Sequence, residues 1–237
     1  MIRTLSAIVF FNLFNYCAEA ATISIRYTHT NSQQQQSTQF YRFTVSDSFT
    51  SSQRTAIRQA LQIVYDEVGQ HFREKHKHND FSGISDFTKC VDDAARRRLD
   101  PFYQTRAQSA VFNANSVMTM MLVMGGRGGT INVMPESQRD GGDFTAAGRA
   151  SVGRGENLNM TINPDILSTI DSRNLAGVIF HEALHRAGWS HPSTGTFATD
   201  YPETLIYEAG LCVQGGTATA TRRLKSRTRG APRILPY

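Results

Sequence analysis

Long apolar runs are scarce in this chain of 237 residues, which argues against a membrane protein. The one early run, over residues 5–14, is shorter than the roughly 20 residues that cross a bilayer. No later run reaches that length, and no internal repeat is visible. A hydrophobic content of 40% suits one globular domain. We therefore expect a soluble mature protein without a membrane span.

Cysteine is nearly absent too, with three residues in all. One of them, Cys17, lies in the N-terminal segment described below, which leaves Cys90 and Cys212. In an oxidising compartment such a pair most simply forms one disulfide, and two unpaired buried thiols are the alternative.

The sequon Asn159-Met160-Thr161 would accept a glycan only in a eukaryotic host.

The first twenty residues have the layout of a secretory signal peptide. A short basic start precedes the apolar run, and Ala18-Glu19-Ala20 supplies a small-x-small cleavage pattern. An uncleaved N-terminal anchor is the alternative. We expect a signal peptide at 1–20 with cleavage near Ala20, a folded domain at 21–220 and a basic tail at 221–237, and hence an extracellular protein.

The formal net charge of +5 is concentrated in that tail. A basic tail could contact acidic surfaces, glycans or nucleic acid, but such a run is more often a solvated terminus, and we favour that interpretation. We expect a monomer with no specific nucleic-acid partner. Contact of the tail with an acidic surface stays open.

The first part of the chain predicts two strands and a helix. Residues 21–27 and 40–45 are typical of strands, and the Ser/Gln-rich residues 31–38 indicate a surface loop. Ser51 and Ser52 offer caps for an amphipathic helix that runs to about Phe72. Its apolar stripe consists of Ile57, Leu61, Val64 and Val68. We expect the three histidines that follow, His71, His76 and His78, to be solvated.

The middle of the chain is harder to assign. Residues 91–99 predict a short helix that Asp100-Pro101 ends. Apolar runs at 117–124 and 130–134, flanked by glycines, indicate buried strands. We interpret the methionines of the first run as core filling. Residues 146–152 and 158–162 predict two further strands.

A late helix carries the candidate chemistry. It starts near Asp171 or Ser172 and places His181 and His185 four residues apart, on one helical face where both imidazoles can grip one ion. Glu182 is placed to act on a water molecule rather than on the metal. Gly188 can adopt the left-handed conformation that ends the helix, and His191 follows three residues later. Three imidazoles with one open position predict a catalytic zinc site.

The segment from His181 to His191, HEALHRAGWSH, resembles the H-E-x-x-H-x-x-G-x-x-H signature of the metzincin zinc endopeptidases. The resemblance implies an α+β fold: a twisted, mostly parallel N-terminal sheet with an antiparallel edge strand, an active-site helix and a small C-terminal subdomain. It also implies one catalytic Zn²⁺ on His181, His185 and His191, with Glu182 as general base and acid. A protein or peptide substrate would pair with an edge strand, whose residues are Ala146, Ala147, Gly148, Arg149, Ala150 and Ser151.

The chain departs from the family downstream of the third histidine. Metzincins carry a methionine in a tight turn below the metal, and this sequence has no methionine after Met160. The segment 207–212 is the expected substitute, with Leu211 or Cys212 as its packing residue. Tyr201 and Tyr207 are candidates for a fifth ligand or for stabilising the transition state.

The resemblance predicts a secreted zinc endopeptidase that hydrolyses peptide bonds with a zinc-activated water. Two alternatives stay open. The third ligand could be Glu203 or Glu208, as in gluzincins, with His191 a coincidence. The chain could also be a secreted binding or toxin-like protein that keeps a zincin scaffold without turning over substrate.

Overall fold

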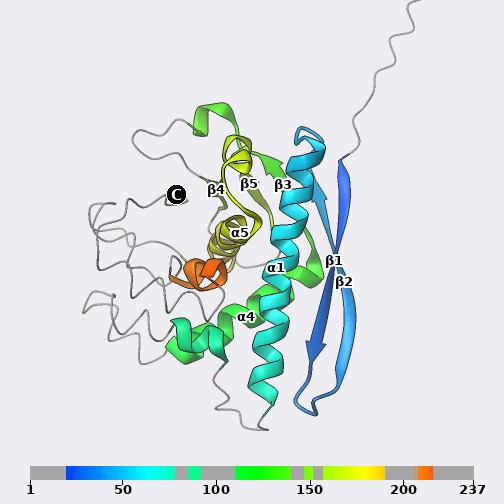
Figure 1. Cartoon of the computed structure of the whole chain (residues 1–237), viewed down its shortest axis with the longest axis vertical. Helices are drawn as coiled ribbons and strands as arrows, with labels where there is room; N and C mark the ends of the chain where they lie inside the picture. Colours follow the sequence, from blue (N-terminus) through cyan, green and yellow to red (C-terminus); the bar gives the residue numbers. More distant parts are fainter. Residues whose placement is uncertain are drawn as a thin grey trace, which may run out of the picture.

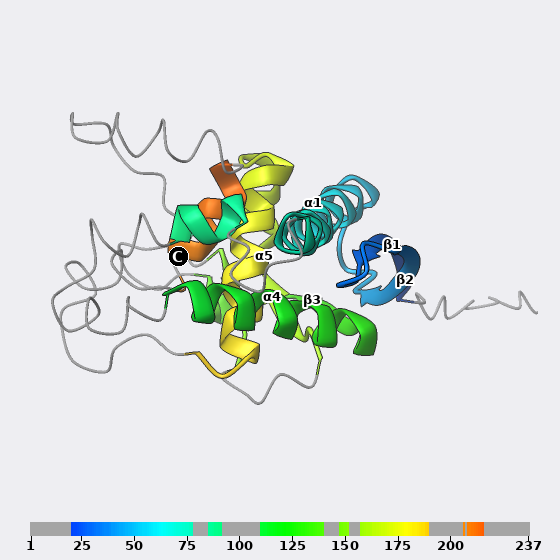
Figure 2. The same cartoon turned by 90° about the horizontal axis from the view of Figure 1, so that it is seen from below.

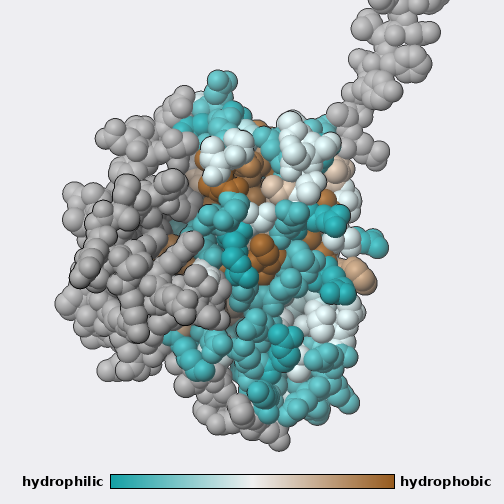
Figure 3. All heavy atoms as spheres, viewed as in Figure 1, coloured by the Kyte–Doolittle hydropathy of each residue, from teal (hydrophilic) through white to brown (hydrophobic). Residues whose placement is uncertain are grey.

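The computed structural model describes residues 20–77, 85–91, 110–139, 147–151, 157–189, 206 and 208–215, without the side chains of 110–114. In this part of the chain a five-stranded mixed sheet packs against helices, so the fold is α+β (Figures 1 and 2). Side chains of the sheet and of the surrounding helices form one hydrophobic core. Hydrophilic residues predominate over α1 on the face shown in Figure 3.

A β-hairpin opens the fold. Strands β1 (Ala21–Thr30) and β2 (Gln36–Val45) pair antiparallel, with Ala21 opposite Val45. Both predicted strands are confirmed but are longer than expected. The loop prediction for residues 31–38 is wrong at Gln36–Thr38, because these exposed polar residues pair their backbone with the end of β1.

Helix α1 (Ser51–His76) crosses the sheet and supplies much of the core. Its N-cap is Thr50, in a capping box with Gln53, and not one of the two serines that follow. The predicted apolar stripe is confirmed, since all four of its side chains are fully buried. Tyr65 of this helix packs against Tyr41 and Phe43 of β2.

The prediction that the three histidines are solvated is wrong for His71. Its side chain is 1% exposed, and its Nδ1 lies 2.7 Å from the Oγ of Ser85. Of the charged residues that follow it in the sequence, Arg73 is exposed and Glu74 and Lys75 are partly exposed, while His71 itself is buried. His76 is partly exposed, and His78 lies outside the described residues.

The run at 117–124 is helical and not a strand, so that prediction is wrong. It belongs to α4 (Ala110–Arg127), in which Val117, Met118, Met121 and Met124 are buried at helical spacing. A continuous apolar run does not by itself distinguish a buried strand from a buried helix. Leucine and methionine favour the helix. The interpretation of the methionines as core filling is confirmed for the three that are fully buried.

The sheet order is β1-β2-β3-β5-β4, with β3 at Gly129–Val133, β4 at Gly148–Arg149 and β5 at Met160–Ile162. The pairings β2–β3 and β3–β5 are parallel, whereas β1–β2 and β4–β5 are antiparallel. The sheet is therefore mixed and not mostly parallel, because the short turn after β1 forces a hairpin. The antiparallel edge strand is confirmed as β4. Short 3₁₀ turns lie at Glu136–Gln138 and Pro164–Ser168.

The predicted disulfide between Cys90 and Cys212 is present. It joins residues 122 positions apart in the sequence, with 5.9 Å between their Cα atoms. Cys90 lies in a short helix at 86–91, and the rest of the helix predicted at 91–99 falls outside the described residues. Within the described ranges, no helix is both long and apolar enough to cross a membrane.

The buried position of His71 predicts that stability falls in mild acid. The pKa of His71 is lowered from 6.5 to about 4. Burial is the main cause and the charge of Lys75 adds to it; a hydrogen bond with Asn115 opposes this, and His76 adds a smaller lowering. Between these two pH values the unfolded chain binds a proton that the folded chain does not. The free energy of unfolding should therefore drop by about 2 to 3 kcal/mol from this residue as the pH falls from 7.5 to 4.5.

Urea unfolding of the wild type and of His71→Gln at both pH values measures this contribution. The variant is expected to be less stable than the wild type at pH 7.5 but to lose less stability on acidification. Equal losses in the two proteins would show that His71 does not titrate in this way.

Candidate functional site

Helix α5 (Ser172–Arg186) carries the residues that the sequence singles out. Asp171 caps it, with its side chain accepting a hydrogen bond from the amide of Asn174 at 2.7 Å. The predicted start is thereby confirmed. Every residue of the helix from Leu175 to His185 is buried, so the polar residues in this stretch lie inside the protein.

The two histidines of α5 lie side by side, as predicted from their spacing. The ring centroids of His181 and His185 are 5.0 Å apart, and the ring planes meet at 78°. Each residue is 8% exposed. Two imidazoles at this separation, on one helical face, match the nitrogen donors that zinc accepts.

Glu182 is buried between α5 and the edge strand. It is 5% exposed, and a Cβ on Gly148 of β4 would lie only 3.0 Å from its Cγ. The pKa of Glu182 is raised to about 8. Burial causes the rise, and a hydrogen bond from the backbone of Ala150 and the charge of Arg149 partly offset it. A carboxyl group whose pKa is near neutrality is suited to accept and return a proton.

The helix ends as the glycine predicts. Gly188 has a φ of +97°, and the amide of Trp189 bonds back to the carbonyl of Leu184 at 3.0 Å. The returning chain brings the carbonyl oxygen of Trp189 within 2.9 Å of the Nδ1 of His185. If Nδ1 donates to this oxygen, Nε2 is left as the metal-binding nitrogen, as is usual for ligand histidines. Sequence reasoning missed this role of Trp189; the glycine before it is the only signal.

The edge-strand prediction is confirmed in part. Only Gly148 and Arg149 form β4, and Ala147, Ala150 and Ser151 flank it, while Ala146 lies outside the described residues. Arg186, the residue after His185, donates hydrogen bonds to the carbonyls of Ser151 and Asn157, both at 3.3 Å. The sequence did not single out this arginine, which ties α5 to the two ends of the segment between β4 and β5.

The remaining predicted residues are His191, Tyr201, Tyr207 and Glu203, and all of them lie outside the described residues. Within the described residues no three His, Cys, Asp or Glu side chains form a group that could hold a metal ion. His181 and His185 supply two suitable donors, so they fit a zinc ion that takes its third ligand from elsewhere.

Residues 208–215 form a helix, which we call the tethered helix because Cys212 joins it to Cys90. The expected tight turn is wrong, because residues 208–215 are helical. That Leu211 or Cys212 packs beneath a bound metal stays a prediction. Gly210 lies against His181, and Cys212 forms the disulfide. Glu208 is 1% exposed and therefore buried within the same helix.

The left-handed conformation of Gly188 predicts a local cost for any side chain there. Gly188→Ala should lower the free energy of unfolding by about 1 to 2 kcal/mol, as measured by urea unfolding. Gly126→Ala is the matched control, because Gly126 is exposed near the end of α4 and a Cβ there would lie 4.0 Å from Cε1 of Tyr41. The control substitution should leave the free energy of unfolding unchanged or raise it slightly. A Gly188→Ala variant as stable as the control would contradict the helix-ending role.

Comparison of the chain with protein-family models, with curated proteins and with solved structures finds no match. What this site does is therefore inferred from its own residues.

Proposed function

We propose that the protein is a secreted zinc-dependent endopeptidase. The observation that supports this best is the arrangement on α5, where the rings of His181 and His185 lie 5.0 Å apart and Glu182 is buried next to the edge strand. A helix rarely buries three ionisable side chains together without a functional reason. The pattern continues through the left-handed Gly188 to His191.

In the proposed site His181, His185 and His191 hold one zinc ion. When bound, zinc would polarise the carbonyl of a peptide bond and lower the pKa of a water molecule towards about 7. The Trp189 carbonyl keeps the ring of His185 in one orientation. Burial lowers the pKa of His185 and so favours its neutral form, although the hydrogen bond to Trp189 opposes this.

Glu182 moves the proton. Its carboxylate takes a proton from the attacking water and passes it to the amine that leaves when the peptide bond breaks. The backbone of Ala150 and the charge of Arg149 stabilise the ionised carboxylate, and burial favours its protonated form. These opposing effects allow both halves of the proton transfer near neutral pH.

The substrate would be a protein or peptide in an extended conformation. Among the described residues β4 is the last strand in the sheet order and pairs with β5 on one side, so a peptide can add on its other side by strand pairing. Gly148 brings this strand close to Glu182. The scissile bond would then lie near the carboxylate.

Secretion is part of the proposal. The Cys90–Cys212 disulfide is typical of proteins from oxidising compartments. The signal-like layout of residues 1–20 agrees with export.

A variant of this function has Glu208 as the third zinc ligand. It is favoured by the burial of Glu208 in the tethered helix, whose Gly210 lies against His181. The reaction would be unchanged, but His191 would not bind metal. We prefer His191 because the glycine that turns the chain towards it has the predicted conformation.

Glu182→Gln separates binding from catalysis. The variant should still bind one zinc per chain, as measured by elemental analysis. Glu182 is not a zinc ligand in the proposed site, so its substitution leaves the ligand set intact. Its hydrolysis of a denatured protein should fall by about 10²- to 10⁴-fold, the usual contribution of a general base.

Glu208→Gln is the matched control, since it also neutralises a buried glutamate near α5. It should keep its zinc and its activity if His191 is the third ligand, whereas loss of zinc would assign that role to Glu208. Undiminished proteolysis by Glu182→Gln would rule out the proposed mechanism. A wild type that binds zinc but cleaves nothing would favour the binding-protein alternative.

A further inference from the structure

We propose that Gly210 is a positioning residue for His181, and that the Cys90–Cys212 disulfide keeps it in place. The inference rests on the proposed function, because His181 matters as a metal ligand only if α5 binds zinc. It gives the tethered helix the supporting role that a methionine turn would otherwise have.

The tethered helix touches α5 at backbone distance. A Cβ added to Gly210 would lie 3.0 Å from the carbonyl oxygen of Gly177 and 3.6 Å from the Cβ of His181. Gly177 is one helical turn before His181, so this contact reaches both the turn that carries the ligand and the ligand itself. A backbone oxygen inside a helix cannot move aside as a flexible side chain can.

A second contact interlocks the two helices. A Cβ added to Gly177 would overlap the Cγ of Gln214, which lies over this turn of α5. Gln214 also donates a hydrogen bond to the carbonyl of Asn174 at 3.5 Å. Gly210 thus leaves room for the carbonyl oxygen of Gly177, and Gly177 leaves room for the side chain of Gln214. Sliding either helix along the other would make these atoms clash.

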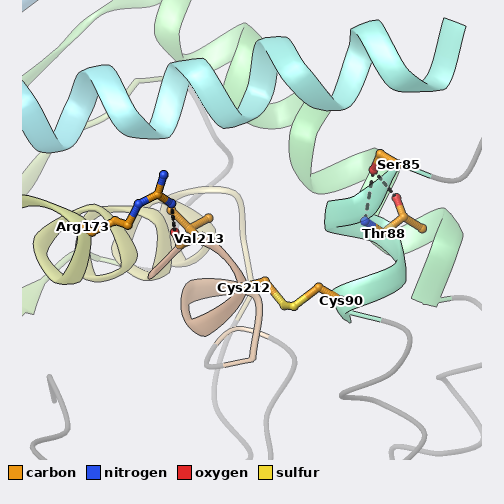
Figure 4. Close-up of a disulfide and its surroundings, with 6 residues drawn as sticks. All are labelled: Ser85, Thr88, Cys90, Arg173, Cys212 and Val213. Atoms are coloured by element: carbon orange, nitrogen blue, oxygen red, sulfur yellow. Dashed lines mark hydrogen bonds between the residues drawn. A yellow bond between two sulfur atoms is a disulfide. The ribbon is translucent and has the colours of Figure 1, made fainter. Parts of the chain in front are cut away.

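Arg173 fastens the far end of the tethered helix. Its guanidinium donates to the carbonyl oxygen of Val213 at 3.2 Å (Figure 4) and forms an ion pair with Glu67 of α1, also at 3.2 Å. Arginine can bridge these two partners because its planar group has several donors. The beginning of α5, the tethered helix and α1 are thereby joined.

The disulfide connects the tethered helix to α1 by another route. Cys212 bonds to Cys90 of the helix at 86–91, and the two sulfur atoms lie between these helices in Figure 4. Ser85, at the start of that helix, accepts a hydrogen bond from the amide of Thr88 at 3.1 Å and lies 2.7 Å from the buried His71 of α1. A continuous set of contacts therefore runs from α1 through the disulfide to Gly210 and His181.

Gly210→Ala tests the positioning role directly. The added methyl group must displace the Gly177 backbone or the tethered helix by a few tenths of an ångström. The dissociation constant for Co²⁺, used as a spectroscopic probe in place of zinc, should rise about 10- to 100-fold, as is typical when a supporting residue around a metal is changed. The visible absorption bands of the bound Co²⁺ should also shift. Gly126→Ala in α4 should change neither.

Gly177→Ala keeps the test decisive if Gly210→Ala does not fold. The single variant should weaken Co²⁺ binding, because its methyl group overlaps Gln214. Gly177→Ala combined with Gln214→Ala removes the overlapping atoms and should restore the affinity and the spectrum.

Hydrogen exchange of the metal-free protein separates this inference from the proposed function. In the double variant Cys90→Ser/Cys212→Ser, the amides of 175–184 should exchange at least tenfold faster than in the wild type, with the amides of β2 less affected. A wild type that binds no Co²⁺ would defeat the proposed function, and the exchange of α5 would still test the positioning of the helix. Wild-type Co²⁺ affinity and spectrum in Gly210→Ala, or unchanged exchange of α5 without the disulfide, would overturn the inference.

Discussion

Burial of two imidazoles and a carboxylate on a single helix is the constraint around which the described structure is arranged. Each of these groups costs free energy when it leaves water, unless it gains a partner. The Trp189 carbonyl lies near His185, and the backbone of Ala150 bonds to Glu182. Without a cation, burial still raises the pKa of Glu182 to about 8. A divalent cation bound by the imidazoles would favour its ionised form again.

Three neighbouring segments lie close to α5: the edge strand, the tethered helix and the chain that follows Gly188. Each of them depends on a glycine. Gly148 brings the edge strand against Glu182, and Gly210 brings the tethered helix against His181. Gly188 turns the chain back so that Trp189 reaches His185. A side chain at Gly148 or Gly210 would hold that neighbour away from α5, and one at Gly188 would disfavour the left-handed turn. The polar side of the helix is thus surrounded by backbone, which is more rigid than side chains and better suited to hold ligands in place.

The part of the site that could be predicted from the sequence is the part determined by local geometry. His181, Glu182, His185 and Gly188 lie within eight consecutive residues, and the helical repeat alone sets their relation. The disulfide was predictable because only two cysteines remain after the signal-like segment. The roles of Trp189, Arg186 and Gly210 were not, since they depend on tertiary contacts that no local pattern records.

The wrong predictions about the fold arise for the same reason, since they too depend on tertiary contacts that the local sequence does not record. The apolar run of α4 was assigned to a strand because continuous hydrophobicity hides its helical spacing, which only the packing against the sheet reveals. The charged neighbours of His71 in the sequence predict a solvated side chain, yet its partner Ser85 lies fourteen positions further on. The hairpin of β1 and β2 was missed as a pairing because the polar residues near its turn carry no hydrophobic pattern.

X-ray absorption spectroscopy of the zinc-loaded protein tests most directly whether three imidazoles converge on one ion. The expected spectrum has about three imidazole nitrogen ligands at roughly 2.0–2.1 Å and one further light atom. His191→Ala should remove one imidazole from this set. A spectrum with only two imidazoles in the wild type, with sulfur ligands, or with no change on substitution of His191 would contradict the three-histidine site.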